Sequence, residues 1–289
     1  MTSRALVWWR GARPRTLGAS VVAVVVGVAA SEATVVWRAI AALVVGVSFQ
    51  IGVNYANDYF DGLKGVDTPR RLGPPRLVAQ ALASSRAVAL AAGLSFLVAA
   101  LAGLALAVVV DLRLLALGAV ALFAAVGYSG GPRPYGGLGL GELSVFVFFG
   151  LMAVAGTSYV MDRQVGAAAW WASVAIGILA VALLVANNLR DIPTDSASGK
   201  RTLAVRLGAD RTRHLYRGLL VASYLVVIGA VIAGAFELPT LAVLITFPLA
   251  VRAGRAISAE GRELISALQS TAALHAGFGL VLAGGLWLS

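Results

Sequence analysis

The sequence predicts an all-α polytopic membrane protein with nine transmembrane helices. Only 12% of its 289 residues are charged and 60% are hydrophobic, whereas soluble domains carry about 25% charged residues. Apolar runs of roughly 15 to 25 residues recur from end to end, close to the length with which a helix crosses a ~30 Å hydrocarbon core. No stretch remains for a separate soluble domain, so residues 1–289 are expected to form a single membrane domain.

The nine apolar runs follow one another with mostly short connections. In chain order they are 16–30, 37–57, 86–110, 113–130, 143–160, 168–188, 216–236, 238–257 and 264–288. The first run also resembles a signal peptide, because four arginines precede it and small residues follow it. Since eight further spans come after it, we interpret 16–30 as an uncleaved first helix.

The basic residues are divided unevenly between the two sides that this topology defines. With a cytoplasmic N-terminus, 20 of the 23 Lys and Arg residues fall on the cytoplasmic side, and only Arg38, Arg113 and Arg163 fall on the other. This asymmetry is the positive-inside rule. It predicts a multi-pass protein of the cell (inner or plasma) membrane, and it explains the net charge of +10 without a nucleic-acid partner.

Several kinds of chemistry are excluded or disfavoured by composition. The chain has no cysteine, which excludes disulfides, thiolate nucleophiles and zinc–sulfur sites. His214 and His275 stand far apart in the sequence, which disfavours a histidine metal site. No GxxxxGK[ST] loop is present, so nucleotide hydrolysis has little support.

Two acidic segments stand at the cytoplasmic ends of the second and sixth runs. In the first, Asn57-Asp58-x-x-Asp61 places its polar side chains on one helix face, at i, i+3 and i+4 spacings. In the second, Asp191 and Asp195 follow Asn187 at four-residue steps, although Pro193 is expected to kink or end that helix. The segments 58–85 and 189–215 are expected to form long charged loops.

The two acidic segments also match each other at an offset of 130 residues. The matched pairs are Ala56 with Ala186, Asn57 with Asn187, Asp61 with Asp191, and Arg71 with Arg201. Internal repeats are common in membrane proteins that bind a ligand at the repeat interface. The expected halves are roughly 16–130 and 143–257, with 264–288 as a ninth helix outside the repeat.

Paired carboxylates rimmed by cations suit a magnesium-bound diphosphate. Magnesium binds one or two carboxylates and completes its octahedron with water and phosphate oxygens, and cationic side chains hold the remaining phosphate charge. The two lysines of the chain, Lys64 and Lys200, lie one in each acidic segment. Solvated loop carboxylates are the plainer interpretation, but the shared helix faces favour a binding site.

A glycine-rich segment, GGPRPYGGLGLGE at 130–142, lies on the same predicted side as the aspartates. Its Pro and Gly content is typical of a tight turn. It also carries Arg133, Tyr135 and Glu142, and Tyr128 directly precedes it. Aromatic faces stabilise cations by about 0.5–2 kcal/mol each, as an allylic cation left by a departing diphosphate would require. Glu142 could equally orient a ligand hydroxyl or cap the fifth helix.

With these residues assembled, the chain resembles the UbiA-type superfamily of intramembrane prenyltransferases. Both superfamily motifs are present, as Asn57-Asp58-x-x-Asp61 and Asp191-x-x-x-Asp195. Within it, the runs 57–68, 130–150 and 187–208 resemble the subfamily that prenylates 1,4-dihydroxy-2-naphthoate in menaquinone biosynthesis. The general pattern places its last aspartate at the position of Gly65, whereas this chain has Asp67, a spacing similar to that of the naphthoate enzymes.

The resemblance implies helices around a central polar cavity open to the cytoplasm. It also implies Mg²⁺ as cofactor, with polyprenyl diphosphate and 1,4-dihydroxy-2-naphthoate as substrates in contact with the lipid bilayer. Together with the chemistry above, it predicts Asp58, Asp61, Asp191 and Asp195 as catalytic metal ligands, joined by Asn57. The predicted diphosphate-binding residues are Lys64, Arg70, Asn187, Lys200 and Arg201, and the predicted acceptor-binding residues are Tyr128, Arg133, Tyr135 and Glu142. Asp67 either touches the metal or orders its loop.

Two other functions remain open at this stage. A related prenyltransferase with another acceptor, such as 4-hydroxybenzoate, would share both aspartate motifs. A secondary transporter would share the spans, the repeat and the buried charges, but it would need a charged path to the outer face, which the later helices do not offer. Prenyl chain length, the number of Mg²⁺ ions and the oligomeric state are not specified by the sequence.

Overall fold

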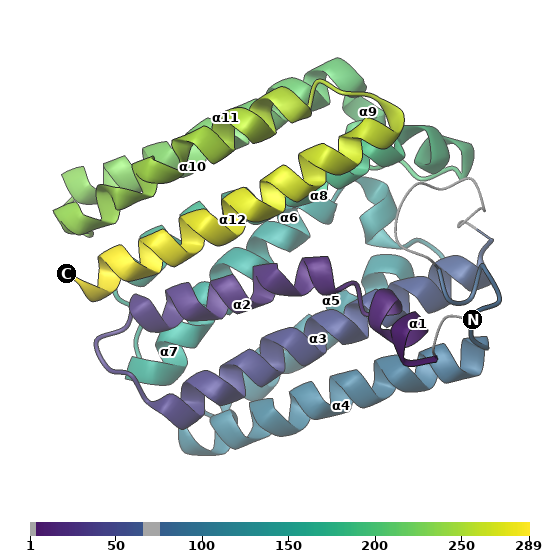
Figure 1. Cartoon of the computed structure of the whole chain (residues 1–289). Coiled ribbons are helices and arrows are strands. Elements are labelled where there is room, and N and C mark those ends of the chain that lie inside the picture. Colours follow the sequence, from purple (N-terminus) through teal and green to yellow (C-terminus); the bar gives the residue numbers. More distant parts are fainter. Residues whose placement is uncertain (1–3, 66–75) are drawn as a thin grey trace.

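The computed structural model describes residues 4–65 and 76–289, and within these ranges the chain is helical with no strand. The long helices run alternately between two ends of one bundle (Figure 1). We call the end that carries segments 130–140 and 198–208 the loop end, and the end with the connections 30–35 and 163–166 the turn end. The N-terminal helix lies at the loop end and the C-terminus at the turn end (Figure 1).

Twelve α-helices and four short segments of other helix types make up the described chain. They are α1 (Arg4–Gly11), α2 (Pro14–Ala29), α3 (Val36–Leu63), α4 (Ser85–Val109), α5 (Arg113–Ser129), η1 (Tyr135–Leu138), α6 (Gly141–Val145), η2 (Phe146–Ala155), α7 (Gly156–Asp162), α8 (Ala167–Ala197), α9 (Leu203–Leu207), α10 (Ala209–Ile232), η3 (Leu238–Thr246), α11 (Phe247–Ala256), η4 (Gly261–Glu263) and α12 (Leu264–Trp287).

Seven of these helical stretches in the described chain are long and apolar enough to cross a membrane, or eight if the bent pair α1–α2 counts as one span. They correspond to seven of the nine predicted runs and confirm a polytopic membrane class. The two remaining runs are also helical, but α2 has 16 residues and α5 has 17. At 1.5 Å per residue they measure about 24–26 Å, slightly less than a ~30 Å hydrocarbon core.

The loop predictions at the two acidic segments were wrong in their boundaries. Helix α3 continues to Leu63, and α8 continues through Pro193 to Ala197. The proline lies in the last two turns of α8, so only the end of the helix lacks a backbone donor. Because both helices extend beyond the apolar runs, their polar residues are held on regular helical backbone.

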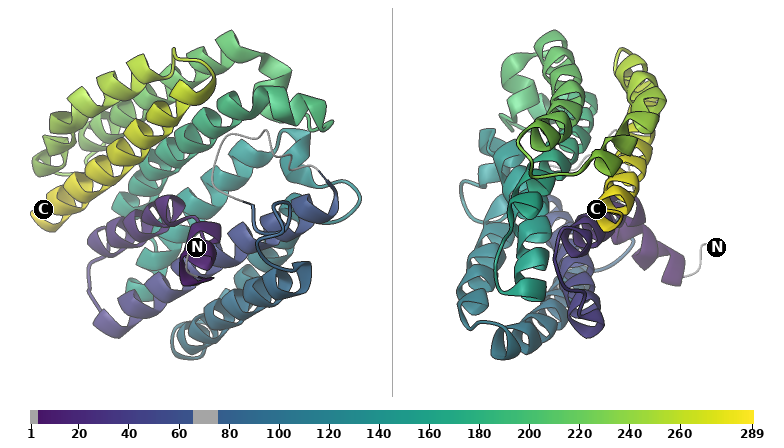
Figure 2. Two further views of the ribbon diagram at one scale, coloured as in Figure 1. Left: turned by 45° about the vertical axis from the view of Figure 1, so that its right-hand side comes forward. Right: turned by 90° about the vertical axis from the view of Figure 1, so that its left-hand side faces the viewer.

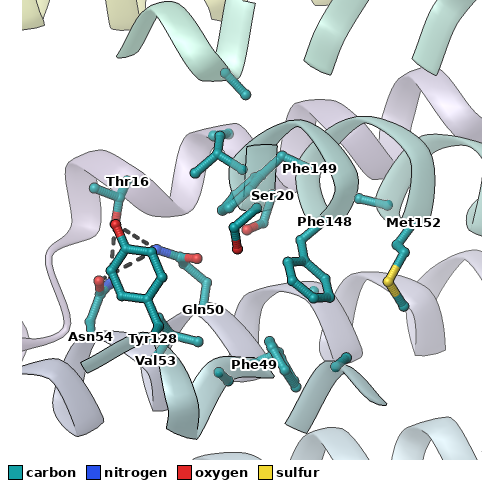
Figure 3. Close-up of a pocket in the computed structure, with 18 of the residues that line it drawn as sticks. Thr16, Ser20, Phe49, Gln50, Val53, Asn54, Tyr128, Phe148, Phe149 and Met152 are labelled. Carbon is teal, nitrogen blue, oxygen red and sulfur yellow. Dashed lines mark hydrogen bonds between the residues drawn. The ribbon is translucent and has the colours of Figure 1, made fainter. Parts of the chain in front are cut away.

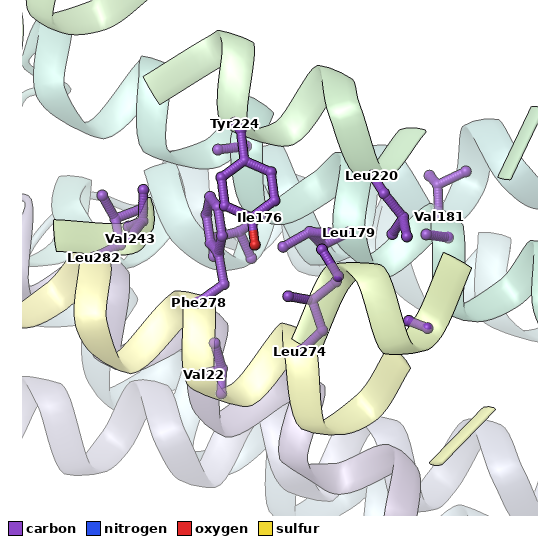
Figure 4. Packing of buried hydrophobic residues seen from close by; sticks show 14 of the residues in the cluster. Val22, Ile176, Leu179, Val181, Leu220, Tyr224, Val243, Leu274, Phe278 and Leu282 are labelled. Atoms are coloured by element: carbon purple, nitrogen blue, oxygen red, sulfur yellow. The ribbon is translucent and has the colours of Figure 1, made fainter. Parts of the chain in front are cut away.

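The largest buried core lies where α2, α8, α10 and α12 meet. Val22 of α2 and Phe278 of α12 pack there with Ile176 and Leu179 of α8 and with Tyr224 of α10 (Figure 4). Helices α3 and α4 pack against each other at the opposite edge of the bundle from α10 and α11 (Figure 2).

The outer face of α4 is apolar and exposed. Leu90, Leu94, Leu97 and Leu101 are each more than half exposed and recur at spacings of three and four residues along one face. Such a stripe is costly in water and is the surface expected against lipid. The exposed leucines therefore support the membrane assignment independently of helix length.

The fifth crossing contains a π-helix of ten residues, η2, between α6 and α7. The segment packs closely against α8, because a Cβ added at Gly150 would lie 2.6 Å from the Ser173 carbonyl oxygen and 2.8 Å from Gly177 Cα. Small residues at such contacts let membrane helices approach each other closely. π-Helical turns are uncommon and occur frequently at functional sites, and here the segment forms one wall of the cavity described next.

Candidate active site

One large cavity of about 1810 Å³ runs through the bundle. Its walls come from α2, α3, α4, α5, η2 and α8, with α1 and the beginning of α12 at the loop end. Asp61, Asp191 and Asp195 lie in its wall near the loop end, whereas toward the turn end the wall is mostly apolar. The cavity therefore has a charged end and a long apolar remainder.

The first aspartate motif contributes Asn57 and Asp61 to the cavity wall. The Ser129 hydroxyl donates to Asn57 Oδ1 at 2.8 Å. Lys200 Nζ donates to Asp61 Oδ2 at 3.1 Å, and both side chains are largely buried. Lys200 belongs to the second acidic segment, so this ion pair joins the two segments that the sequence relates by an offset of 130.

Asp58 lies away from the cavity, although it stands in the same motif. Its carboxylate accepts hydrogen bonds from the backbone N–H groups of Leu77 and Val78, at 2.9 and 3.0 Å, and its side chain is buried. It thus fixes the point at which the chain returns before α4. The predictions for Asp67 and Arg70 lie outside the described residues.

The second motif places Asn187, Asp191 and Asp195 of α8 in the same cavity wall. The Arg190 guanidinium binds Asp191 through two hydrogen bonds, Nε to Oδ1 at 2.7 Å and Nη2 to Oδ2 at 2.8 Å. Nη2 also donates to Asn187 Oδ1 at 2.8 Å. Arg190 lines the cavity but was missed from the sequence, because neighbours at i, i+1 do not normally face each other on a helix.

Two of the predicted diphosphate-binding cations lie elsewhere. Lys64 is exposed and donates to the carbonyl oxygens of Ser129 and Gly131, both at 2.8 Å. Arg201 is also exposed, and its backbone N–H bonds to the Gly137 carbonyl at 2.9 Å. Neither side chain lines the cavity, so both contribute to the order of the loop end in this arrangement.

The predicted acceptor residues divide into two groups. Tyr128 and Tyr135 line the cavity and pack edge to face, with ring centroids 5.4 Å apart. The Tyr135 hydroxyl donates to the Ala124 carbonyl at 2.8 Å, and burial raises the pKa of its phenol, which keeps it protonated. Arg133, in contrast, is exposed on the loop and does not line the cavity.

Glu142 is buried just behind the cavity wall. Its Oε1 accepts a hydrogen bond at 3.0 Å from Asn188, which itself lines the cavity, while Oε2 is buried without a partner among the described residues. Glu142 is the second residue of α6, whose N-cap position is occupied by Leu140. The geometry therefore favours a role in orienting Asn188 over a helix cap.

The oxygen donors of the two motifs do not form a closed metal cage. Among the described residues, no three His, Asp or Glu side chains gather closely enough to hold an ion by themselves. Magnesium typically takes one or two protein carboxylates and fills its other positions with water and phosphate oxygens. Asp61, Asp191 and Asp195, with the Asn57 and Asn187 amides beside them, therefore fit a magnesium ion that arrives with a phosphate ligand.

The apolar part of the cavity is lined by aromatic and thioether side chains. Phe148, Phe149 and Met152 of η2 face Phe49 and Val53 of α3 (Figure 3). The wide turn of the π-helix turns the adjacent residues Phe148 and Phe149 both toward the cavity. The sequence does not predict that both phenylalanines face the cavity, because a π-helical segment has no sequence pattern that distinguishes it from an apolar α-helix.

Fold and site together define a class: a helical membrane protein with an oxygen-lined site, suited to a metal-bound phosphate, that opens into a long apolar cavity. The model of the UbiA prenyltransferase family matches residues 19–285. The chain belongs to this family, as the aspartate motifs in the sequence indicated. It is 46% identical over 284 residues to the 1,4-dihydroxy-2-naphthoate octaprenyltransferase of Mycobacterium tuberculosis, with 96% of each chain covered.

Solved structures of the family share this fold. The apo structure of a UbiA homolog from Aeropyrum pernix matches with a TM-score of 0.72 at 15% identity, covering 94% of this chain and 97% of that one. A UbiA homolog from Archaeoglobus fulgidus bound to GPP and Mg²⁺ matches with a TM-score of 0.66 at 14% identity, covering 96% and 99%. At these identities the likeness establishes the arrangement of helices alone.

Proposed function

We propose that the protein transfers a polyprenyl group from polyprenyl diphosphate to 1,4-dihydroxy-2-naphthoate, with loss of carbon dioxide, to give demethylmenaquinol in menaquinone biosynthesis. The observation that carries the proposal is that both aspartate motifs meet on one wall of a cavity whose remainder is apolar. A polyprenyl diphosphate has the same division into a charged head and a long apolar tail. The acceptor follows from the relative of Mycobacterium tuberculosis, which is similar over nearly the whole chain.

The donor's diphosphate would lie at the loop end of the cavity. Asp61, Asp191 and Asp195, with Asn57 and Asn187, would hold Mg²⁺ there, and the ion would supply positive charge that neutralises the departing diphosphate. Lys200 and Arg190 also line the cavity and would bind phosphate oxygens. The Archaeoglobus fulgidus homolog bound to GPP and Mg²⁺ supports this pairing of diphosphate and metal.

The reaction exchanges one bond at the allylic carbon. Its C–O bond breaks and the electron pair leaves with pyrophosphate, while a new C–C bond forms to the naphthalene ring. The bond from the ring to the carboxylate carbon also breaks, releases carbon dioxide and returns its electron pair to the ring. Tyr128, Tyr135 and Phe149 line the cavity, and their rings would stabilise positive charge that develops on the prenyl group.

We further propose that the chain crosses the cell membrane nine times as one prenyltransferase domain, with its N-terminus and the site facing the cytoplasm. The basic residues of the loop end support this orientation under the positive-inside rule. The nine helical passes would be two repeat halves, roughly 16–130 and 143–257, and the ninth helix 264–288. The repeat is supported by two pairs of residues that are 130 positions apart and all line one cavity: Asn57 with Asn187, and Asp61 with Asp191.

Purified protein in detergent, with labelled polyprenyl diphosphate and each acceptor in turn, tests the proposal. We expect a labelled prenyl-naphthalene product and released carbon dioxide with the naphthoate, little product with 4-hydroxybenzoate, and no turnover once EDTA removes Mg²⁺. Comparable turnover of both acids would refute the acceptor assignment but not prenyl transfer. Absence of transfer to either acid would refute the proposed function.

A further inference from the structure

A second polar group of side chains lies in the cavity, deeper than the aspartates and made of neutral residues. Asn54 Nδ2 donates to the Ala12 carbonyl at 2.9 Å and to Thr16 Oγ1 at 3.1 Å. Gln50 Nε2 lies 3.4 Å from both Thr16 Oγ1 and Asn54 Oδ1 (Figure 3). These contacts join α3 to the beginning of α2 and hold the three side chains in fixed positions.

The same cavity wall contains an arginine whose guanidinium group has a buried nitrogen without a hydrogen-bond partner among the described residues. Arg13 lines the cavity, and its Nη2 atom is buried with no hydrogen-bond partner in the described part of the chain. Its backbone is left-handed, with φ 53° and ψ 65°, and the Thr16 N–H and hydroxyl both donate to its carbonyl at 2.9 Å. A strained backbone and an unmatched guanidinium are both unfavourable, and such outliers concentrate at ligand sites.

The surroundings define the ligand that fits. A planar guanidinium pairs best with a carboxylate or phosphate, and the neutral amide and hydroxyl groups beside it suit ligand hydroxyls. Phe49, Val53 and Phe149 form apolar walls next to this group of side chains (Figure 3). An aromatic hydroxy acid combines these three features: a carboxylate, ring hydroxyls and a flat apolar ring.

The position of this polar group on α3 suits an acceptor that reacts with the prenyl diphosphate bound at the aspartates. Gln50, Asn54, Asn57 and Asp61 recur at spacings of three and four residues and all line the cavity. Asn54 and Asp61 are seven residues apart, which is about 10 Å along the helix axis. A ring bound at Gln50 and Asn54 would therefore lie beyond the diphosphate on the side of the apolar cavity, where the allylic carbon must also lie.

We infer that Arg13, Thr16 and Gln50 form the subsite for the acceptor, with Arg13 bound to its carboxylate. This inference rests on the proposed function for the identity of the acid, and it replaces Arg133 as the predicted carboxylate partner. A phosphate of the donor would satisfy the same guanidinium. The acceptor is favoured because Thr16, Gln50 and Asn54 are neutral and Lys200 and Arg190 already stand beside the aspartates, while Arg10 and Arg76 are further cations in the cavity lining.

The test compares Arg13→Gln and Arg13→Lys with Arg133→Gln, and takes Arg252→Gln of the exposed face of α11 as the matched control. Steady-state turnover is measured with 1,4-dihydroxy-2-naphthoate and with 1,4-dihydroxynaphthalene, which lacks the carboxylate. We expect Arg13→Gln to raise the KM for the naphthoate by about 10- to 100-fold, the loss typical of one charged hydrogen-bond partner. The donor KM should stay within about twofold, and Arg13→Lys should recover part of the loss.

The analogue supplies the discriminating comparison. With 1,4-dihydroxynaphthalene, wild type and Arg13→Gln should have the same KM, because no carboxylate is present. A folded Arg13→Gln protein with an unchanged naphthoate KM, a rise in the donor KM of equal size, or a larger effect of Arg133→Gln would each overturn the inference.

Equilibrium binding of the stable acid 1-hydroxy-2-naphthoate separates this subsite from the proposed function, because it needs no turnover. Binding that weakens in Arg13→Gln and survives in Arg252→Gln supports the subsite even if no prenyl group is transferred, an outcome that would refute only the proposed function. Normal turnover together with binding that is independent of Arg13 would refute only the subsite.

Discussion

Asp61→Asn and Asp191→Asn remove one negative charge each from positions that the 130-residue offset makes equivalent, but they leave different cations behind. Asp61 pairs with Lys200, whose side chain is 23% exposed, through one contact at 3.1 Å. Asp191 receives two hydrogen bonds from Arg190, whose side chain is 5% exposed. The two substitutions should therefore have the same effect on catalysis and unequal effects on stability.

For turnover, losing one electrostatic group that acts on a developing charge typically costs about 10²–10³ in rate, and we expect this loss for each variant. The double variant should be far less than multiplicatively worse, since both residues serve one assembly. For stability, Lys200 can turn toward solvent, so Asp61→Asn should cost at most about 1 kcal/mol. Asp191→Asn leaves the buried Arg190 only partly paired, a change that typically costs about 3–5 kcal/mol.

Both quantities are measured on the same purified samples, as turnover against Mg²⁺ concentration and as thermal unfolding in one detergent. Asp210→Asn is the control, because Asp210 is 90% exposed and pairs with Arg213, and neither residue lines the cavity. Folded single variants that keep more than about a third of wild-type turnover at limiting Mg²⁺ would refute the site, since solvated helix ends predict that result. Equal stability losses in the two variants would refute the buried pairing of Arg190.

Three further predictions concern residues outside the cavity or at its edge. Asp58→Asn should lower the unfolding temperature, because a backbone N–H group of Leu77 or Val78 loses its carboxylate acceptor, at a cost of about 1–3 kcal/mol. The Mg²⁺ concentration for half-maximal activity should stay unchanged. A changed Mg²⁺ requirement would instead assign Asp58 to the metal site. Gly150→Ala should destabilise by about 1–3 kcal/mol because its new Cβ meets the backbone of α8, whereas Gly156→Ala, with nothing within 4 Å, should not; equal unfolding temperatures would contradict the close packing. The hydrogen bond from Tyr159 holds the pKa of Asp111 below its usual 3.8, so the ionised form stabilises the fold above that pH and the contribution is lost as pH falls through the lower folded value. Unfolding temperatures of wild type and Asp111→Asn should accordingly differ at neutral pH and converge in acid, and a constant difference would refute the assignment.

The sequence predicted the membrane class and the meeting of the two aspartate motifs, because apolar length and helical spacing depend on local physics. Asp61, Asp191 and Asp195 share one cavity, as their spacing and the repeat indicated. The difference between Asp58 and Asp61 could not be predicted in this way. It depends on where the chain returns at Leu77 and Val78, which is a tertiary contact and leaves no pattern within the motif.

Other features were missed for related reasons. Arg13 was counted among the basic residues before the first helix, but its backbone conformation and buried Nη2 follow only from the turn between α1 and α2. The π-helix η2 has the composition of any apolar crossing. Arg133 stood in a segment typical of the naphthoate subfamily, yet the glycine-rich turn holds its side chain outward. Tyr135 of the same segment lines the cavity, so the resemblance did not determine which of its side chains faces the cavity.

The placement of the polar stripe on α3 has a consequence for how the protein is made. Gln50, Asn54, Asn57 and Asp61 all fall in the second half of this 28-residue helix, whereas its first fourteen residues carry one charge, Arg38, close to the turn end. Insertion of a charged side chain costs about 2.5–3.5 kcal/mol at the centre of a transmembrane segment and less toward its ends. A newly synthesised α3 therefore enters lipid as a stable segment before α8 exists to face it. The carboxylates of α3 lie beyond the apolar run 37–57, close to the headgroups, where water can solvate them until the second half of the chain arrives.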